Sequence, residues 1–360
     1  MLNLLALLYL APSAQACSVI AAGDAGSPTI VHNVDWYAKF PGVEGAFFRN
    51  AANVSKVGEL FGAPGTPATW TSRYRSVTFS IAGAEFPVAG INEKGLSVSV
   101  LELVETKYPP ATDPRAAVSP TQFAQYQLDR SATIEEVIAS DKDIRPQSSI
   151  IKMHFFTCDA SGKCAVIQFL DGKMHVFQGA DLPYAALTNS AYPASVDAAK
   201  LCTSDSCDVA DKSLWRFAEV NRLAPSLAGG NLPERAYQVL DHVKQEANTV
   251  TRFQMIYNAD KGDFTVRRAG SDNVARLHAA FSDKTCAGAH PYIPIDEGTN
   301  GDVSKSWTQF TPEKGIEMSQ RMGYPASLAN VSGVYSFQKT SGGECSASAR
   351  KIRARAPASK

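Results

Sequence analysis

The chain lacks an excess of charge of either sign. Its 35 basic and 35 acidic side chains give a formal net charge of zero over 360 residues. Proteins that hold nucleic acid through its phosphates need a surplus of basic residues, so this composition argues against a nucleic-acid partner. The chain also lacks an apolar run near the roughly 20 residues that a membrane-spanning helix needs. We therefore expect neither a nucleic-acid-binding protein nor a stable membrane span.

A shorter apolar run does stand at the N-terminus, from Leu2 to Leu10. It is followed by Ala14-Gln15-Ala16, which places small residues at the two positions that a signal peptidase reads. This pattern predicts a signal peptide over residues 1–16 and a periplasmic or secreted protein. No lysine or arginine precedes the apolar run, so either the free amino terminus supplies the positive charge or the true start lies upstream.

Cysteines are few, and their spacing does not suit zinc. The seven cysteines include no Cys-x-x-Cys pair, and no histidine lies at ligand spacing from a cysteine pair, so we expect no metal and no cofactor. In an oxidising compartment, short loops between cysteines can close as local disulfides. The expected disulfides are Cys158–Cys164, Cys202–Cys207 and, over a longer range, Cys286–Cys345. Cys17 is left over, directly after the predicted cleavage site.

Apolar or β-branched runs bounded by turn residues recur along the chain and indicate antiparallel hairpins. The expected strands are residues 17–23 with 29–37, 86–91 with 96–103, 154–158 with 164–170 and 174–178, and 253–258 with 263–268. No internal repeat or long linker interrupts the pattern. We expect one catalytic domain over residues 17–345, followed by a basic, disordered tail over residues 346–360.

Helices are expected between these strands. Ser119 followed by Pro120 favours a helix start before residues 121–130, and Thr133 with Glu136 forms a capping box for residues 134–140. Apolar residues at helical spacing predict two further helices, at residues 213–224 and 232–247. Hairpin sheets with helices in separate blocks are typical of an α+β protein, here two antiparallel sheets packed between helices.

The first predicted hairpin places chemistry beside Cys17. If its strands pair symmetrically about Gly26, Cys17 lies opposite Asp35 and the two side chains share one face. Cleavage after Ala16 would give Cys17 a free α-amine, whose pKa of about 7.7–8.0 lies near the thiol's pKa of about 8.5. Nucleophile and base would then come from one residue, with Asp35 orienting the ammonium group.

Two other interpretations of Cys17 stay open. A lone buried cysteine is commonly a core residue, although its place directly after a cleavage site would then be a coincidence. Lipidation also uses a cysteine after a signal sequence, and it would give a non-catalytic binding protein anchored through Cys17. The leucine usual three residues before a lipidated cysteine is Ala14 here, which argues against the lipoprotein.

Four motifs that follow Cys17 in order resemble a known family. They are Asn33-Val34-Asp35-Trp36, the segment GINEKGL at residues 90–96, Leu187-Thr188-Asn189, and the segment SLWRF at residues 213–217. Together they resemble the choloylglycine hydrolase family, which comprises the bile salt hydrolases and penicillin V acylases among the N-terminal-nucleophile hydrolases. A form with a signal peptide looks most like its exported Gram-negative branch, whose members include penicillin V acylases and enzymes that cleave acyl-homoserine lactones.

The resemblance implies an αββα sandwich that hydrolyses a linear carbon–nitrogen amide bond of a small N-acyl substrate. Cys17 would attack the carbonyl, and its own amine would carry the proton to the leaving nitrogen. Asn189 and the backbone N–H of Glu102 match the two oxyanion-hole donors, and Arg216 matches an arginine near the active site. Relatives are commonly homotetramers, although no interface is evident in this sequence.

The sequence departs from the family pattern at two positions. His32 stands where the family has arginine, so it would shift the pH optimum, be catalytically idle, or mark a divergent subfamily. Glu102 replaces asparagine or tryptophan, and its carboxylate either enters the pocket, favouring a cationic or hydroxylated substrate group, or points outward. Trp36 and Tyr37, with other nearby aromatic residues, either line an apolar acyl pocket or belong to the core.

Overall fold

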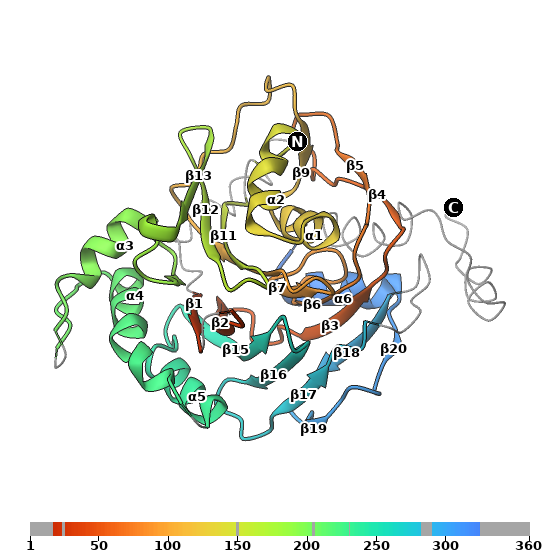
Figure 1. Cartoon of the computed structure of the whole chain (residues 1–360). Helices are drawn as coiled ribbons and strands as arrows, with labels where there is room; N and C mark the ends of the chain where they lie inside the picture. Colours follow the sequence, from red (N-terminus) through yellow and green to blue (C-terminus); the bar gives the residue numbers. More distant parts are fainter. Residues whose placement is uncertain are drawn as a thin grey trace.

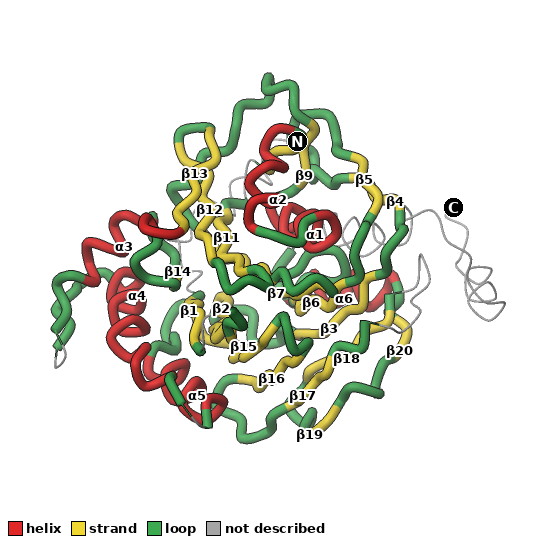
Figure 2. The backbone as a smooth tube through the Cα atoms, viewed as in Figure 1, coloured by secondary structure: helices red, strands yellow, loops and turns green. Residues whose placement is uncertain are grey.

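The computed structural model describes residues 17–23, 26–148, 151–203, 206–229, 231–281 and 290–324. Two large sheets lie face to face in Figure 1, and helices cover the outer side of each. Helix α1 packs on strands β7 and β8 of one sheet, whereas α4 and α5 pack on β1, β2 and β15 of the other. Figure 2 shows the same layers by element type. The predicted α+β class and the αββα sandwich are confirmed.

The first large sheet holds the predicted N-terminal hairpin as the second and third of its seven strands. Its seven strands in spatial order are β14 (Ala186–Leu187), β1 (Ser18–Ala22), β2 (Thr29–Tyr37), β15 (Thr249–Asn258), β16 (Asp263–Arg268), β17 (Ala275–His278) and β19 (Gly301–Asp302). All neighbours are antiparallel except β17 and β19.

The second large sheet contains the predicted hairpins over residues 86–103 and 154–178, whereas the predicted hairpin over residues 253–268 lies in the first sheet. Its nine strands in spatial order are β13 (Lys173–Gln178), β12 (Cys164–Leu170), β11 (Met153–Cys158), β8 (Ser97–Glu102), β7 (Ala89–Asn92), β6 (Ser76–Ser80), β3 (Gly45–Asn50), β18 (Pro291–Ile295) and β20 (Thr308–Gln309). Two small sheets pair β4 (Ser55–Val57) with β5 (Thr69–Thr71), and β9 (Ala116–Val118) with β10 (Ile144–Pro146).

Helices begin where the sequence supplies caps. The α-helices are α1 (Pro120–Arg130), α2 (Ile134–Ala139), α3 (Tyr192–Ala199), α4 (Lys212–Leu223), α5 (Leu232–His242) and α6 (Pro312–Arg321), and short 3-10 helices are η1 (Ser140–Lys142), η2 (Gly179–Asp181) and η3 (Ala224–Leu227). The predicted caps of α1 and α2 are present, because Ser119 accepts from the N–H of Gln122 and Thr133 from that of Glu136. Helix α5 ends at His242, so the predicted helix over residues 232–247 was too long.

Aromatic side chains fill the space between the two sheets. Phe47 and Phe79 of the second sheet meet Phe264 and Phe253 of the first, with ring centroids 5.1 Å apart in both pairs. Burying each ring contributes about 2–3 kcal/mol. Gly45 lies against the rings of Phe79 and Phe253, where a Cβ would collide with them. This interior fixes the spacing of the sheets and therefore of the groups at their ends.

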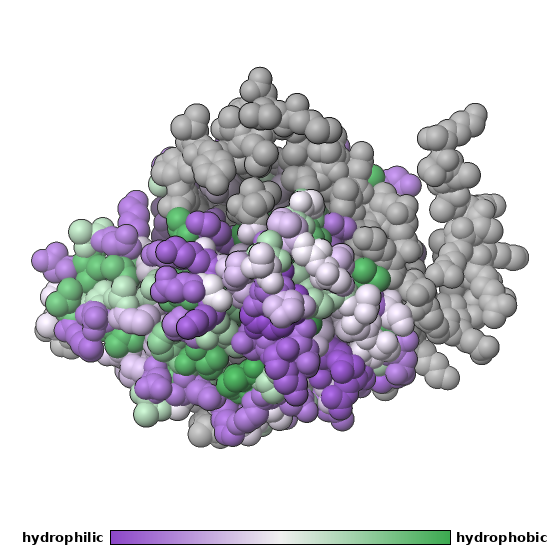
Figure 3. All heavy atoms as spheres, turned by 90° about the horizontal axis from the view of Figure 1, so that it is seen from above, coloured by the Kyte–Doolittle hydropathy of each residue, from purple (hydrophilic) through white to green (hydrophobic). Residues whose placement is uncertain are grey.

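Two of the three predicted disulfides are present, Cys158–Cys164 and Cys202–Cys207. Cys286 and Cys345, the predicted signal peptide and the basic tail all lie outside the described residues. Within the described part, no helix has the length and apolar character needed to cross a membrane. The face in Figure 3 is mostly polar, with apolar side chains in small patches. Val104 and Leu201 are the large apolar side chains most exposed in the described residues.

Candidate active site

The N-terminal hairpin forms as predicted, but its register is shifted by one residue. Ser18 pairs with Asn33, and Ala22 pairs with Thr29. Continued by one residue, this register places Cys17 opposite Val34 rather than opposite Asp35. The symmetric prediction put one residue at the apex of the turn, whereas an even number of residues separates Ala22 from Thr29. The predicted direct pairing of Cys17 with Asp35 was therefore wrong.

Cys17 and Asp35 nevertheless lie in contact at the end of the hairpin. The backbone N–H of Asp35 donates a hydrogen bond to the Cys17 sulfur, and the Asp35 carboxylate lies close enough to raise the pKa of the thiol. Burial is the larger cause, and the pKa of Cys17 is raised to about 12. Burial and the Asp35 carboxylate therefore hold the thiol in its protonated form near neutral pH.

Asp35 is a buried carboxyl group without a matching donor. Its residue is 2% exposed, and neither carboxylate oxygen has a hydrogen-bond partner within the part of the chain that the structure describes. Burial raises the pKa of Asp35 to about 7, against the opposing influence of Arg216 and of the nearby Thr251 hydroxyl. A buried carboxylate in this state is costly unless a cation joins it. The site therefore favours a positive group beside Cys17.

Arg216 ties the nucleophile to the rest of the site. It lies on α4 and is 1% exposed. One guanidinium nitrogen donates to the Cys17 carbonyl oxygen at 2.5 Å and to the Ser18 hydroxyl at 2.7 Å. Its other terminal nitrogen donates to Oδ1 of Asn189 at 3.1 Å. Because an arginine presents its donors in one plane, this side chain fixes the backbone of Cys17 relative to Asn189.

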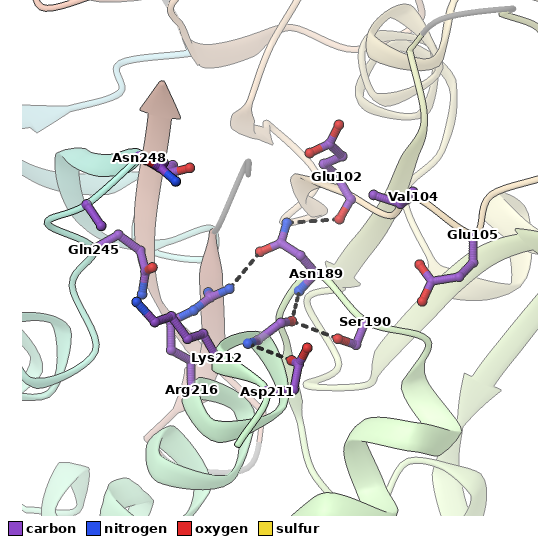
Figure 4. A pocket seen from close by; sticks show the side chains of 13 residues that line it. Glu102, Val104, Glu105, Asn189, Ser190, Asp211, Lys212, Arg216, Gln245 and Asn248 are labelled. Carbon is purple, nitrogen blue, oxygen red and sulfur yellow. Dashed lines mark hydrogen bonds between the residues drawn. The ribbon is translucent and has the colours of Figure 1, made fainter. Parts of the chain in front are cut away.

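Asn189 lies directly after β14 and joins the two sheets. Its Nδ2 donates to the backbone oxygen of Glu102 at 2.9 Å, and its own N–H donates to Ser213 Oγ at 2.9 Å. The amide nitrogen carries two hydrogens. Hydrogen bonds among the described residues use one of them, so the second can meet a substrate oxygen. Figure 4 shows Asn189 between Glu102 and Arg216.

Glu102 ends β8, so its backbone lies at the edge of the site. Its side chain faces the site, because its charge raises the pKa values of Cys17, Tyr37 and Tyr324. Of the two alternatives for this carboxylate, the structure supports the inward one. The role of the Glu102 backbone N–H as an oxyanion donor stays a prediction.

His32 lies on β2, three residues before Asp35. It pairs with Val19 and Met255 in the sheet, and alternation along β2 puts it on the face of Val34, opposite the face of Asp35. Its ring is fully buried, and neither ring nitrogen has a partner among the described residues. Burial lowers the pKa of His32 to about 3, so the ring is neutral. The neutral ring supplies no cation, and the role of His32 stays a prediction.

The aromatic residues after Asp35 divide between core and site. Trp36 is buried and donates from its indole nitrogen to the Met322 carbonyl oxygen at 3.1 Å. Tyr37 is half-buried, packs edge-on against Trp36 and Phe40, and lies near the charge of Glu102. Neither Trp36 nor Tyr37 lines the cavity described below. A role for them in substrate binding stays a prediction.

A cavity of about 440 Å³ opens beside Asn189, Arg216 and Glu102. Its charged lining residues are Glu102, Glu105, Asp211, Lys212 and Arg216. Figure 4 shows Glu102 and Glu105 on one side of it and Lys212 and Arg216 on the other. Within the described residues, no group of three or more histidine, cysteine or acidic side chains could hold a metal ion.

Sequence reasoning missed two supporting residues. Ser18 binds Arg216 directly, and Ser213 receives the Asn189 N–H while its own hydroxyl donates to Thr188 at 3.2 Å. Ser213 is the first residue of the SLWRF motif and Ser18 follows Cys17, so both stood in segments that the sequence had singled out. Their roles depend on contacts between distant segments, which no local pattern reveals.

Solved structures share this fold. The penicillin V acylase from Agrobacterium tumefaciens superimposes with a TM-score of 0.67 at 20% identity, covering 81% of this chain and 97% of that one. A variant of the conjugated bile acid hydrolase from Clostridium perfringens gives a TM-score of 0.61 at 15% identity, covering 79% and 98%. These likenesses show that the chain has the fold of those hydrolases.

Sequence comparison finds similarity over part of the chain. Residues 77–195 match the sequence model of the linear amide C–N hydrolases, choloylglycine hydrolase family. A penicillin V acylase from Pectobacterium atrosepticum is 34% identical over 136 residues. That match covers 34% of this chain and spans only 36% of the length of that curated relative. Within residues 77–195, the chain is therefore similar to the choloylglycine hydrolase family.

Proposed function

We propose that this protein is an exported cysteine amidohydrolase that cleaves a linear amide bond of N-acyl substrates after cleavage between Ala16 and Cys17. The observation that carries the proposal is the buried Asp35 carboxyl group, which contacts Cys17 and lacks a donor among the described residues. Cleavage creates an ammonium group on Cys17 itself, beside that carboxylate. The site then gains the cation that its electrostatics favour.

The free α-amine also supplies the missing base. In the uncleaved chain, burial and Asp35 hold the thiol protonated, with a pKa raised to about 12. A free α-amine has an intrinsic pKa of about 7.7–8.0, so it is partly neutral near pH 7.5 and can take the thiol proton. Asp35 would orient the resulting ammonium, as the third member of a triad orients its base.

The remaining groups suit amide cleavage. The Cys17 sulfur attacks the substrate carbonyl carbon, and the second hydrogen on Asn189 Nδ2 stabilises the developing oxyanion. One such donor can lower the barrier by about 3–4 kcal/mol. The ammonium returns its proton to the leaving nitrogen, the amine departs, and water releases the acyl group from sulfur. Arg216 positions this constellation through the Cys17 carbonyl oxygen and Asn189.

The test compares substitutions at two kinds of cysteine. Cys17→Ser and the matched control Cys202→Ser with Cys207→Ser are each assayed on penicillin V, bile-salt conjugates, acyl-homoserine lactones and N-acyl amino acids. We expect Cys17→Ser to lose at least about a hundredfold in kcat/KM, because a hydroxyl is a far weaker nucleophile near neutral pH. The control should retain its activity. Undiminished hydrolysis by Cys17→Ser would overturn the assignment.

A further inference from the structure

Most residues that line the cavity beside Asn189 are polar or charged, which suits the polar half of a substrate. Among the described residues that line it, only Val104 and Ala247 are apolar. An apolar acyl chain placed there would strip water from charged side chains without replacing their hydrogen bonds, which is costly. The amine half of the amide, released when the acyl group moves to Cys17, is the part that this lining suits.

The two ends of the cavity differ in charge. Glu102 and Glu105 come from the end of β8 and the loop after it, whereas Lys212 stands in the first turn of α4. Figure 4 places the two glutamates across the cavity from Lys212. Asp211 adds little to this contrast, because its Oδ1 caps α4 by accepting from the N–H groups of Ser213 and Leu214.

We propose that the leaving group is a basic α-amino acid, so that the substrate is an N-acylated lysine, ornithine or arginine. The cationic side chain lies against Glu102 and Glu105, and the α-carboxylate lies toward Lys212. This inference rests on the proposed function. Hydrolysis adds water across the amide bond: the acyl carbon receives the hydroxyl as a carboxylic acid, and the nitrogen receives the proton as a free α-amine.

The experiment uses the chain that begins at Cys17 and four substrates with one common acyl group. The amines are lysine, its neutral isostere norleucine, glutamate, and lysinamide, each acylated on the α-nitrogen. We expect kcat/KM for the lysine compound to exceed that for the norleucine compound about tenfold, and the glutamate compound to be poorest. The lysine compound should also exceed lysinamide, whose carboxylate is masked.

Three variants test which lining residues recognise the cationic side chain and the α-carboxylate of the substrate. Glu105→Gln should lower the lysine-to-norleucine ratio, and Glu105→Lys should invert it toward glutamate. Lys212→Gln should remove the advantage of lysine over lysinamide. The matched control is Glu313→Gln, because Glu313 is an exposed glutamate on α6 that does not line the cavity. It should leave all four ratios unchanged. The ratios are the readout, so a general loss of activity in a variant does not affect the conclusion.

Binding measurements separate this inference from the proposed function. Cys17→Ala removes the nucleophile, and calorimetry on that variant compares the lysine and norleucine compounds without turnover. Hydrolysis of all four substrates at similar rates would overturn this inference and leave the amidohydrolase intact. Preferred binding of the lysine compound without hydrolysis by the parent chain would overturn the proposed function and leave the ligand class standing. Equal binding together with no hydrolysis would overturn both.

Discussion

The chemistry that we propose depends on a carboxyl group that the fold buries beside Cys17. Asp35 contacts Cys17 and finds no donor among the described residues, and burial raises its pKa to about 7. An ordinary core position would not tolerate this arrangement, because an unpaired buried carboxyl group destabilises the fold. The α-amine that the proposed cleavage would create on Cys17 accounts for it at the level of single residues.

Asp35→Asn should act in opposite directions before and after cleavage. In a chain that still carries residues ahead of Cys17, we expect the variant to raise the free energy of unfolding by about 1–2 kcal/mol, because an unmatched buried acid is replaced by a neutral amide. In the chain that begins at Cys17, the variant removes the partner of the ammonium group and should lower both stability and kcat. Urea unfolding of both forms measures the effect. The same sign in both forms would contradict the account.

His32→Leu tests the histidine that departs from the family pattern. The folded-state pKa of His32 is lowered from 6.5 to about 3, so only the unfolded chain binds its proton between those values. Its contribution to stability is present above pH 6.5 and is lost as pH falls, by about 1.4 kcal/mol per unit. At pH 5 the variant should therefore retain about 2 kcal/mol more of its pH 7 stability than the parent. Urea unfolding at pH 5 and at pH 7 measures the free energy of unfolding of both proteins. An equal loss of stability in variant and parent between these pH values would refute the prediction.

Elements with local signals were predictable, and those that depend on distant contacts were not. Helices α1 and α2 were expected because Ser119 and Thr133 cap them from within their own sequence. Helix α6 was missed although Thr311 caps it and Pro312 opens it, so a usable signal was overlooked. Helix α3 lacks a side-chain cap, which leaves little for the sequence to show.

The register of the N-terminal hairpin and the geometry of the site could not be predicted from the sequence. The pairing of Ser18 with Asn33 depends on the number of residues in the turn. Because the observed turn is one residue shorter than the predicted one, Cys17 lies opposite Val34 instead of Asp35. The motifs named Asn189 and Arg216, yet their hydrogen bond and the contact of Arg216 with Cys17 join segments far apart in the chain. Local patterns carry no information about such contacts.

The cap of α4 links helix stability to the site, because that helix carries Arg216 and Ser213. Asp211→Ala should cost about 1 kcal/mol of unfolding free energy. It should also lower kcat, because fraying of the first turn releases Ser213 from Asn189. Asp211→Asn is the matched control, since asparagine also caps helices. Thermal unfolding and kinetics on one substrate measure both effects. Reduced stability with an unchanged kcat would contradict the predicted link between the helix cap and the active site.

At the scale of the whole molecule, the sandwich brings groups from both sheets and from one helix layer to a common edge. Cys17 and Asp35 come from the first sheet, Glu102 from the second, and Arg216 from the helix layer outside the first sheet. Asn189 bridges the sheets by bonding both Glu102 and Arg216. The aromatic interior holds the sheets at the distance that these hydrogen bonds require, so the site belongs to the fold as a whole.

The central claim is that Cys17 becomes the first residue and carries a free α-amine. Intact-mass measurement of the protein recovered from an exporting bacterial host tests it most directly. The account predicts a mass equal to the chain that starts at Cys17, without any adduct on that residue. A mass that retains Gln15 and Ala16 would contradict it, because no α-amine would then stand beside the thiol. A lipid-sized increment on Cys17 would contradict it as well, since the nucleophile would be blocked.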